Sequence, residues 1–122
     1  MSWDFNNDRP IYLQLMEKIQ LKIICGDYKP GEKLPSVRNI ASNASVNPNT
    51  MQKALTELEK TGLVFSKRTS GRYITEDSNM IENMKKNLAK EQINDFLKSM
   101  EKIGYTKEQT IELVETIIKE MK

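Results

Sequence analysis

The sequence predicts a mainly α-helical chain of the α+β class. Apolar residues recur at helical spacing in five segments, and residues that start or stop helices flank these segments. One pair of short apolar runs, separated by a polar stretch that ends in glycine, has the pattern of a β-hairpin. We therefore expect three helices, a two-stranded hairpin and two further helices, in that order.

The first predicted helix runs from about Pro10 to Cys25. Its apolar residues recur every fourth position, at Ile11, Leu15, Ile19 and Ile23. Pro10 suits the first turn of a helix, and Gly26 suits the left-handed residue that ends one. Cys25 is expected to be a small buried side chain at this helix end. Farther along, Pro30-Gly31 has the residues of a type II turn.

A second, shorter helix is predicted from Ser36, which can act as its N-cap, to about Asn43. Its inward-facing residues should be Val37, Ile40 and Ala41. A tight turn at Ala44–Ser45 follows. Two helices joined by so short a turn form a helix-turn-helix.

The third predicted helix runs from Asn47 to about Lys60, and Gly62 ends it. Asn47 can accept a hydrogen bond as an N-cap, and Pro48 suits the first helical position. The first turns then carry amide and hydroxyl side chains, which can bond base edges, and a cation for phosphate. These residues are Asn49, Thr50, Gln52 and Lys53.

Leu63–Phe65 reads as a strand and Arg72–Thr75 as its partner. Between them lies the polar tip 66–71, which contains two adjacent cations, Lys67 and Arg68. Three helices followed by such a hairpin have the order of a winged helix-turn-helix. We assign this domain to residues 1–75.

Residues 76–122 are predicted to form a helical hairpin for dimerisation. Gly104 should stop its first helix, and Thr106 with Gln109 forms a capping box that should start the second. Two such helices cannot bury both apolar stripes against each other, so the surplus must pack on the winged domain or on a second chain. We favour a second chain, because two-fold dimers are the commonest oligomers. The expected interface residues are Ile81, Met84, Leu88, Ile93, Phe96, Leu97, Met100, Ile111, Val114, Ile117, Ile118 and Met121.

The composition argues against an enzyme. The chain has no histidine and a single cysteine, which removes the usual nucleophile–base pairs, most zinc sites and an internal disulfide framework. No cofactor or metal is expected. There is no apolar run long enough to span a membrane, and the polar, acidic first residues do not resemble a signal peptide. A cytoplasmic protein is expected.

Charge is distributed unevenly along the chain. Residues 1–75 hold 11 Lys and Arg against 7 Asp and Glu, whereas residues 76–122 hold 8 against 10. The formal net charge is only +2. A basic front part and an acidic tail are expected if only the front part meets phosphates.

Several spaced motifs resemble the GntR family of bacterial transcription regulators. They are Pro10-Ile11-Tyr12-Leu13-Gln14-Leu15, Leu34-Pro35-Ser36-Val37-Arg38, Val46-Asn47-Pro48-Asn49-Thr50 and Leu58-Glu59 with Gly62-Leu63. The resemblance covers about residues 3–75. The short helical tail is similar to that of the YtrA-type branch, in which a helical hairpin makes the dimer.

The resemblance implies a homodimer that binds a two-fold symmetric DNA operator, usually as a repressor and often beside transporter genes. It also implies which residues meet DNA, namely the start of the second helix, the front of the third helix and the wing. By position these are Ser36, Arg38, Asn47, Pro48, Asn49, Thr50, Gln52, Lys53, Lys67, Arg68, Thr69, Ser70, Gly71 and Arg72.

This chain departs from the family pattern in the wing and in the turn between the second and third helices. Thr69 stands in the wing where glycine is common, and Arg72 where threonine is common, so Arg72 is expected to add a phosphate contact. Ser45 stands in the turn where glycine is common, and a positive φ there would carry strain.

Some of these residues have a second explanation. Asn47 and Pro48 are sufficiently explained by starting a helix, whereas nothing in packing asks for Asn49, Thr50 or Gln52. The alternative function is a winged-helix adaptor that binds protein and not DNA. The partners expected are double-stranded operator DNA and a second copy of the chain, and a small-molecule effector of unknown identity is left open.

Overall fold

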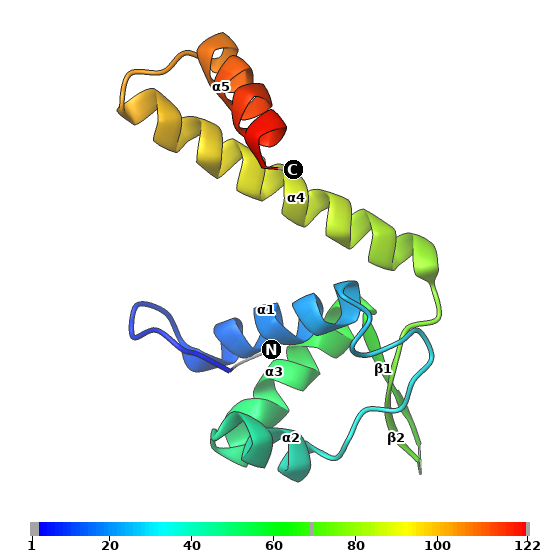
Figure 1. The fold of residues 1–122 in the computed structure, drawn as a ribbon. Helices are drawn as coiled ribbons and strands as arrows, with labels where there is room; N and C mark the ends of the chain where they lie inside the picture. Colours follow the sequence, from blue (N-terminus) through cyan, green and yellow to red (C-terminus); the bar gives the residue numbers. More distant parts are fainter. Residues whose placement is uncertain (1–2, 69, 122) are drawn as a thin grey trace. The chain divides into compact units, whose positions relative to one another are not determined.

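The computed structural model describes residues 3–68 and 70–121, and it has the predicted order of elements (Figure 1). The elements are α1 (Ile11–Ile24), α2 (Val37–Ala44), α3 (Pro48–Thr61), β1 (Val64–Lys67), β2 (Gly71–Ile74), α4 (Ser78–Lys102) and α5 (Lys107–Glu120). The chain divides into two compact units, Met1–Met84 and Lys85–Lys122. Among the described residues, no helix combines the length and the apolar character needed to cross a membrane.

The helix caps predicted from the sequence are present in the first unit. The Ser36 hydroxyl accepts a hydrogen bond from the Asn39 backbone N–H at 3.1 Å, and this starts α2. The Asn47 side chain accepts one from the Asn49 N–H at 2.7 Å, and Pro48 is the first residue of α3. The C-terminal end of α3 is Gly62, with φ of 85°. The cap at Asn47 and the left-handed backbone of Gly62 therefore set the two ends of α3.

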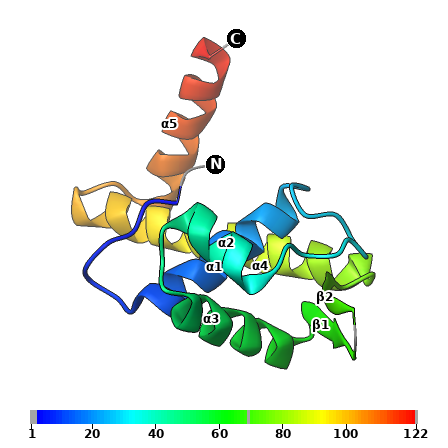
Figure 2. The ribbon, with the colours of Figure 1, turned by 90° about the horizontal axis from the view of Figure 1, so that it is seen from below.

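One core fills the first unit. α1 and α2 both pack on α3, and the hairpin follows directly from the end of α3 (Figures 1 and 2). The largest fully buried side chains of this core are Leu15, Ile19, Met51, Leu55, Leu58, Leu63, Val64 and Ile74. Cys25 does not join them: it is exposed at the C-cap of α1, which corrects the expectation that it is buried.

The turn between α2 and α3 is closed by Ser45. This residue has φ of 58°, the one positive φ at a non-glycine position among the described residues. The left-handed conformation brings its Cβ close to the backbone, so the turn carries the strain that the sequence suggested. The neighbouring Val46 N–H donates to the Ala41 carbonyl at 3.0 Å and completes the turn.

Replacing Ser45 with glycine is therefore expected to raise the free energy of unfolding by about 0.5–1 kcal/mol, because glycine adopts this φ without strain. Thermal unfolding measures the change. Ser42→Gly is the matched control: Ser42 is an exposed residue inside α2, where glycine should lower stability by about 0.5 kcal/mol. A lower melting temperature for Ser45→Gly would contradict the account of the turn.

The hairpin is longer than predicted and its tip is shorter. β1 begins at Val64 and reaches Lys67, and Ser66 and Lys67 pair with Arg72 and Gly71 in register. The sequence placed Ser66 in the tip because it is polar. In the structure its side chain bonds Glu59 of α3, so a polar residue is held within the strand.

A third extended segment, Glu32–Leu34, lies along β2 and was not predicted. The Leu34 N–H donates to the Arg72 carbonyl at 2.8 Å, and the Ile74 N–H donates to the Glu32 carbonyl at 2.9 Å. The segment follows the predicted turn, in which Gly31 has φ of 77° and the Glu32 N–H donates to the Lys29 carbonyl. It is too short for the alternation by which strands are recognised.

The second unit contains α4 from Lys85 onward and the whole of α5. The capping box is formed: the Thr106 hydroxyl accepts from the Gln109 N–H at 3.1 Å, and the Gln109 side chain accepts from the Thr106 N–H at 2.9 Å. Gly104 has φ of 97° in the connection. Figure 2 shows that α5 leaves the end of α4 and diverges from it, so the two helices share little surface.

Candidate nucleic-acid interface

The front of α3 presents polar side chains to solvent. Its inner side buries Met51, Ala54, Leu55 and Leu58, which fix the helix on the core. Helical periodicity then directs the remaining residues outward. Of the predicted reading residues, Asn47, Pro48, Asn49, Gln52 and Lys53 are exposed and Thr50 is half-buried.

α2 brings a second set of exposed groups to the same edge of the unit. In Figure 1 α2, the start of α3 and the end of the hairpin all lie toward the lower edge. Ser36 and Arg38 are exposed at the first turn of α2. The side-chain oxygens of Ser36 and Asn47 accept hydrogen bonds from backbone N–H groups in the first turns of α2 and α3. The first turn of each helix is therefore ordered before any ligand binds.

Lys53 is held against α1. Its ammonium lies 4.0 Å from the centre of the Tyr12 ring, close enough for a cation–π contact. Tyr12 is a half-buried residue of α1. Its contact with Lys53 could not be found from spacing, because the two residues come from different helices.

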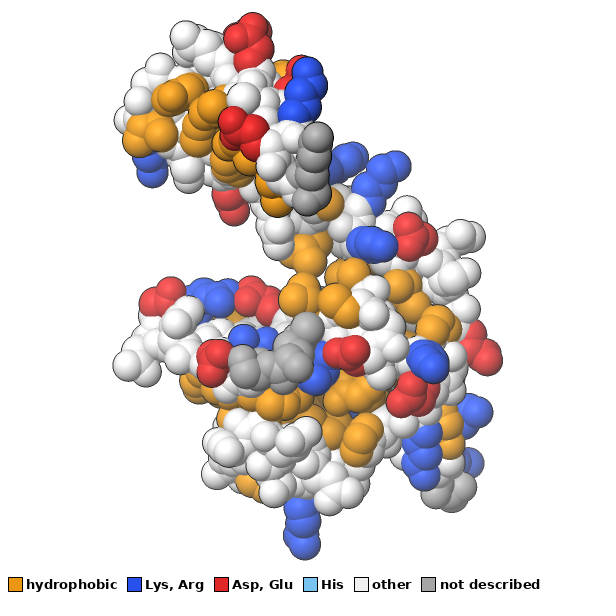
Figure 3. Space-filling model, viewed as in Figure 1, with side chains coloured by type: hydrophobic (Ala, Val, Ile, Leu, Met, Phe, Trp, Pro, Cys, Tyr) orange, Lys and Arg blue, Asp and Glu red, His pale blue; other side chains and the backbone are white. Residues whose placement is uncertain are grey.

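The wing carries cations that rest on an aromatic face. Lys67 and Arg68 are exposed, and the Lys67 ammonium lies 4.4 Å from the centre of the Tyr73 ring. The hydroxyl of Ser70 is hydrogen-bonded to that of Tyr73, and Phe65 stacks on Tyr73. Lys and Arg side chains are visible beside the wing in Figure 3. Gly71 is exposed, and Thr69 lies outside the described residues.

The guanidinium of Arg72, which was expected to contact phosphate, is bound to a carboxylate of the protein. Its Nε lies 2.5 Å from Oε1 of Glu59 on α3, and only 17% of its side chain is exposed. The Ser66 hydroxyl donates to the same oxygen at 2.6 Å. Partial burial alone would raise the pKa of Glu59, but the hydrogen bonds from Ser66 and Arg72 and the charge of Arg72 outweigh it, and the pKa lies below its ordinary value.

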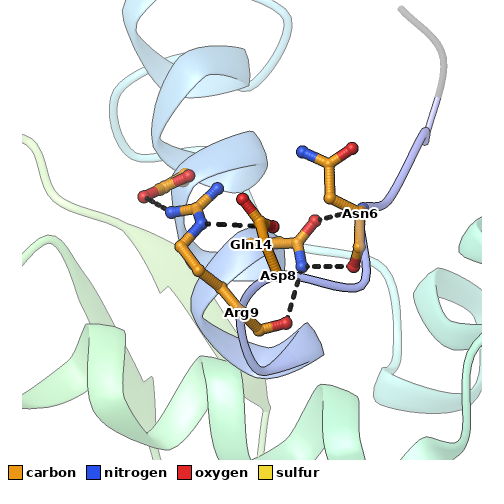
Figure 4. A network of polar contacts seen from close by, with 5 residues as sticks. Asn6, Asp8, Arg9 and Gln14 are labelled. Carbon is orange, nitrogen blue, oxygen red and sulfur yellow. Dashed lines mark hydrogen bonds and ion pairs between the residues drawn. The ribbon is translucent and has the colours of Figure 1, made fainter.

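The N-terminal arm is fastened to α1 by a buried amide, Gln14, whose role no sequence pattern indicates. The Gln14 side chain accepts from the Asn6 N–H at 2.8 Å and donates to the carbonyls of Asn6 and Arg9, each at 2.9 Å (Figure 4). Arg9 in turn donates to Glu17 at 2.6 Å. All the polar atoms of Gln14 are thus engaged within the arm, and Gln14 positions the arm rather than a ligand.

The second candidate surface is apolar and belongs to the second unit. Seven of its large hydrophobic residues are between 43% and 72% exposed, an unusual concentration for a unit of this size. They are Ile93, Phe96, Ile103, Ile111, Ile117, Ile118 and Met121. Leu88, Leu97, Met100 and Val114 are half-buried. Figure 3 shows apolar side chains gathered over α4 and α5.

Two residues predicted for the dimer interface lie elsewhere. Ile81 is buried in the core of the first unit, and Met84 packs against that core. The compact unit therefore extends past residue 75 to Met84. The physical reason is that both residues lie in the first turns of α4, which follow closely after β2 and pack on the core of the first unit. Ile81 is the one buried residue of α4, and it lies near the N-terminal end of the helix.

Among the described residues, no group of three or more His, Cys, Asp or Glu side chains is arranged to hold a metal ion. The polar side chains on the edge formed by α2, the front of α3 and the wing are amides, hydroxyls and cations. Amides and hydroxyls can bond base edges, and cations can neutralise phosphates. The chemistry of this edge therefore suits DNA.

Comparison with known proteins agrees with the fold. Residues 11–74 match the family described as "Bacterial regulatory proteins, gntR family". The chain is 34% identical over 121 residues to the HTH-type transcriptional repressor YtrA of Bacillus subtilis, which covers 98% of this chain and 92% of YtrA.

Two solved structures extend the comparison. A GntR family transcriptional regulator from Listeria monocytogenes is 39% identical, with a TM-score of 0.84 over 92% of this chain and 98% of that one. The DNA-binding domain of AraR in complex with operator ORX1 is 26% identical, with a TM-score of 0.55 over 59% of this chain and 93% of that one.

These similarities confirm the resemblance predicted from the sequence, including the YtrA-type branch, and they confirm the winged helix-turn-helix. The adaptor that binds protein and not DNA has no support among the relatives. The chain is a DNA-binding transcriptional regulator, and it belongs to the gntR family of bacterial regulatory proteins.

Proposed function

We propose that this regulator is a homodimeric repressor that binds a two-fold symmetric operator in the bacterial cytoplasm. The observation that carries the proposal is the polar front of α3, exposed on the same edge of the unit as the first turn of α2 and the wing. In a helix-turn-helix, the second of the two helices enters the major groove by its N-terminal residues. The resemblance to regulators beside transporter genes makes a transporter operon the expected target.

The exposed residues divide into two roles. Asn49, Thr50 and Gln52 would read base edges, since amides and hydroxyls form the specific contacts of the major groove. The cations would bind phosphates and fix the register of the protein on DNA. These are Arg38, Lys53, Lys67 and Arg68. Ser36 would shape the start of α2, and Asn47 and Pro48 the start of α3, where these helices meet the DNA backbone. Ser70 and Gly71 would shape the tip of the wing.

A second copy of the chain is the proposed partner of the apolar surface on α4 and α5. Monomeric soluble proteins rarely expose contiguous apolar surface of this kind. The similarity to the YtrA repressor extends over the tail as well as the winged domain, since it covers 98% of this chain. Two copies joined at their tails would present two reading helices, which suits a symmetric operator.

Replacing Arg38 with alanine is expected to weaken operator binding by about 1–3 kcal/mol without unfolding the domain, because the side chain is exposed. A gel-shift titration measures the loss. Arg9→Ala is the matched control, since it removes an exposed arginine that is paired with Glu17 on the N-terminal arm, and its affinity should match that of wild type. Equal affinities for Arg38→Ala and wild type would refute the role of Arg38.

A further inference from the structure

The guanidinium of Arg72 joins the wing to the reading surface of α3. While its Nε is bound to Glu59, its Nη1 faces the side-chain oxygen of Gln52 at 3.5 Å. Glu59 also receives the Ser66 hydroxyl from the neighbouring strand. A single carboxylate thus fixes one residue from each strand of the wing, and the fixed arginine reaches a residue of the predicted reading set.

The charge of Arg72 is already compensated. A charge-assisted hydrogen bond to a carboxylate is about twice as strong as one between neutral groups. The two side chains are also largely shielded, with 17% of Arg72 and 28% of Glu59 exposed. Moving Arg72 to a phosphate would leave Glu59 without its cation beside a polyanion. Arg72 is thus better placed to act within the protein than on the DNA backbone.

The contact with Arg72 decides which way the Gln52 amide points. Arginine can only donate hydrogen bonds, so the amide atom facing it must be the oxygen. The amide NH₂ of Gln52 then points away from Arg72 as a donor. At 3.5 Å the contact is long and restrains the amide rather than locking it. Without Arg72 the amide could turn over and present either a donor or an acceptor.

We propose that Arg72 is a positioning residue for base reading. Anchored by Glu59, it holds the oxygen of Gln52 and leaves the NH₂ group to donate to an acceptor in the major groove. The acceptors of this kind are N7 and O6 of guanine, N7 of adenine and O4 of thymine. The inference rests on the proposed function, in which Gln52 reads a base.

The test compares the DNA preferences of four proteins selected on one random pool of duplexes: wild type, Gln52→Ala, Arg72→Lys and Glu59→Gln. Gln52→Ala should lose the preference at one base pair in each half-site. Arg72→Lys and Glu59→Gln should weaken the preference at that same base pair by about fivefold or more, and preserve the others. Lysine keeps the charge but not the planar fork of arginine, so it separates positioning from phosphate binding.

Thermal unfolding of each variant shows that it is folded before selection, and Glu59→Gln tests the anchor without touching Arg72. The salt dependence of affinity gives a second measurement. If Arg72 bound phosphate, Arg72→Ala would lower the slope of log affinity against log salt by about one for each copy, and Arg72→Lys would keep the wild-type base preference. Either result would refute the positioning role of Arg72 and leave the proposed function intact. A wild type that enriches no sequence would instead refute the proposed function.

Discussion

Phe96→Lys should convert the protein from dimer to monomer and weaken operator binding about 100-fold or more. Phe96 is 43% exposed in the apolar surface of α4. Its partner in a second chain would have to bury the new ammonium without a counter-charge, which is costly. Once the dimer is lost, the two half-sites no longer raise each other's effective concentration. Sedimentation measures the first effect and a gel-shift titration the second.

Asn94→Lys is the matched control for this charge. It adds the same side chain at an exposed position two residues away, which is a turn of about 200° around α4. The control should remain a dimer with wild-type affinity. Ile117→Lys, on α5, should behave like Phe96→Lys. An unaltered dimer in both lysine variants would show that the interface lies on another surface.

The second large effect is a steep loss of operator affinity with salt. Four exposed cations in each protomer, namely Arg38, Lys53, Lys67 and Arg68, would release counterions on binding. For a dimer this predicts a slope of log affinity against log salt on the order of −7. Affinity should then fall about 10⁴-fold between about 50 and 200 mM salt. Fluorescence anisotropy with a labelled operator measures the slope.

The variants separate the contributions to this slope. Arg38→Ala should lower its magnitude by about two, one unit for each protomer, whereas Arg9→Ala should leave it unchanged. A slope near zero for the wild type would mean that phosphate contacts contribute little. That outcome would contradict the assignment of the four cations to the DNA backbone.

Features set by neighbouring residues could be predicted from the sequence. The Asn47 cap, the Pro48 start and the Thr106–Gln109 capping box each depend on residues within one helical turn, and all are present. The order of helices and strands followed from the periodic spacing of apolar residues, which depends only on residues close together in the chain. The DNA-reading set stays a prediction, although the structure exposes most of it on one edge.

Features set by distant residues could not be predicted. Glu59 and Arg72 are 13 residues apart, and nothing in their spacing shows that a strand returns to α3 beside this carboxylate. The apolar residues of α4 looked like one stripe because most of the gaps between them are three or four residues. Only the burial of Ile81 shows that the first turns of α4 belong to the core of the first unit.

The most direct test of the central claim is selection of bound DNA from a random pool by the purified full chain. A homodimeric repressor should enrich a sequence with two-fold symmetry, whose half-sites are separated by about one helical turn of DNA or a multiple of it. The selected duplex should bind two copies of the chain. Enrichment of an asymmetric site by a single copy, or of no sequence, would contradict this claim.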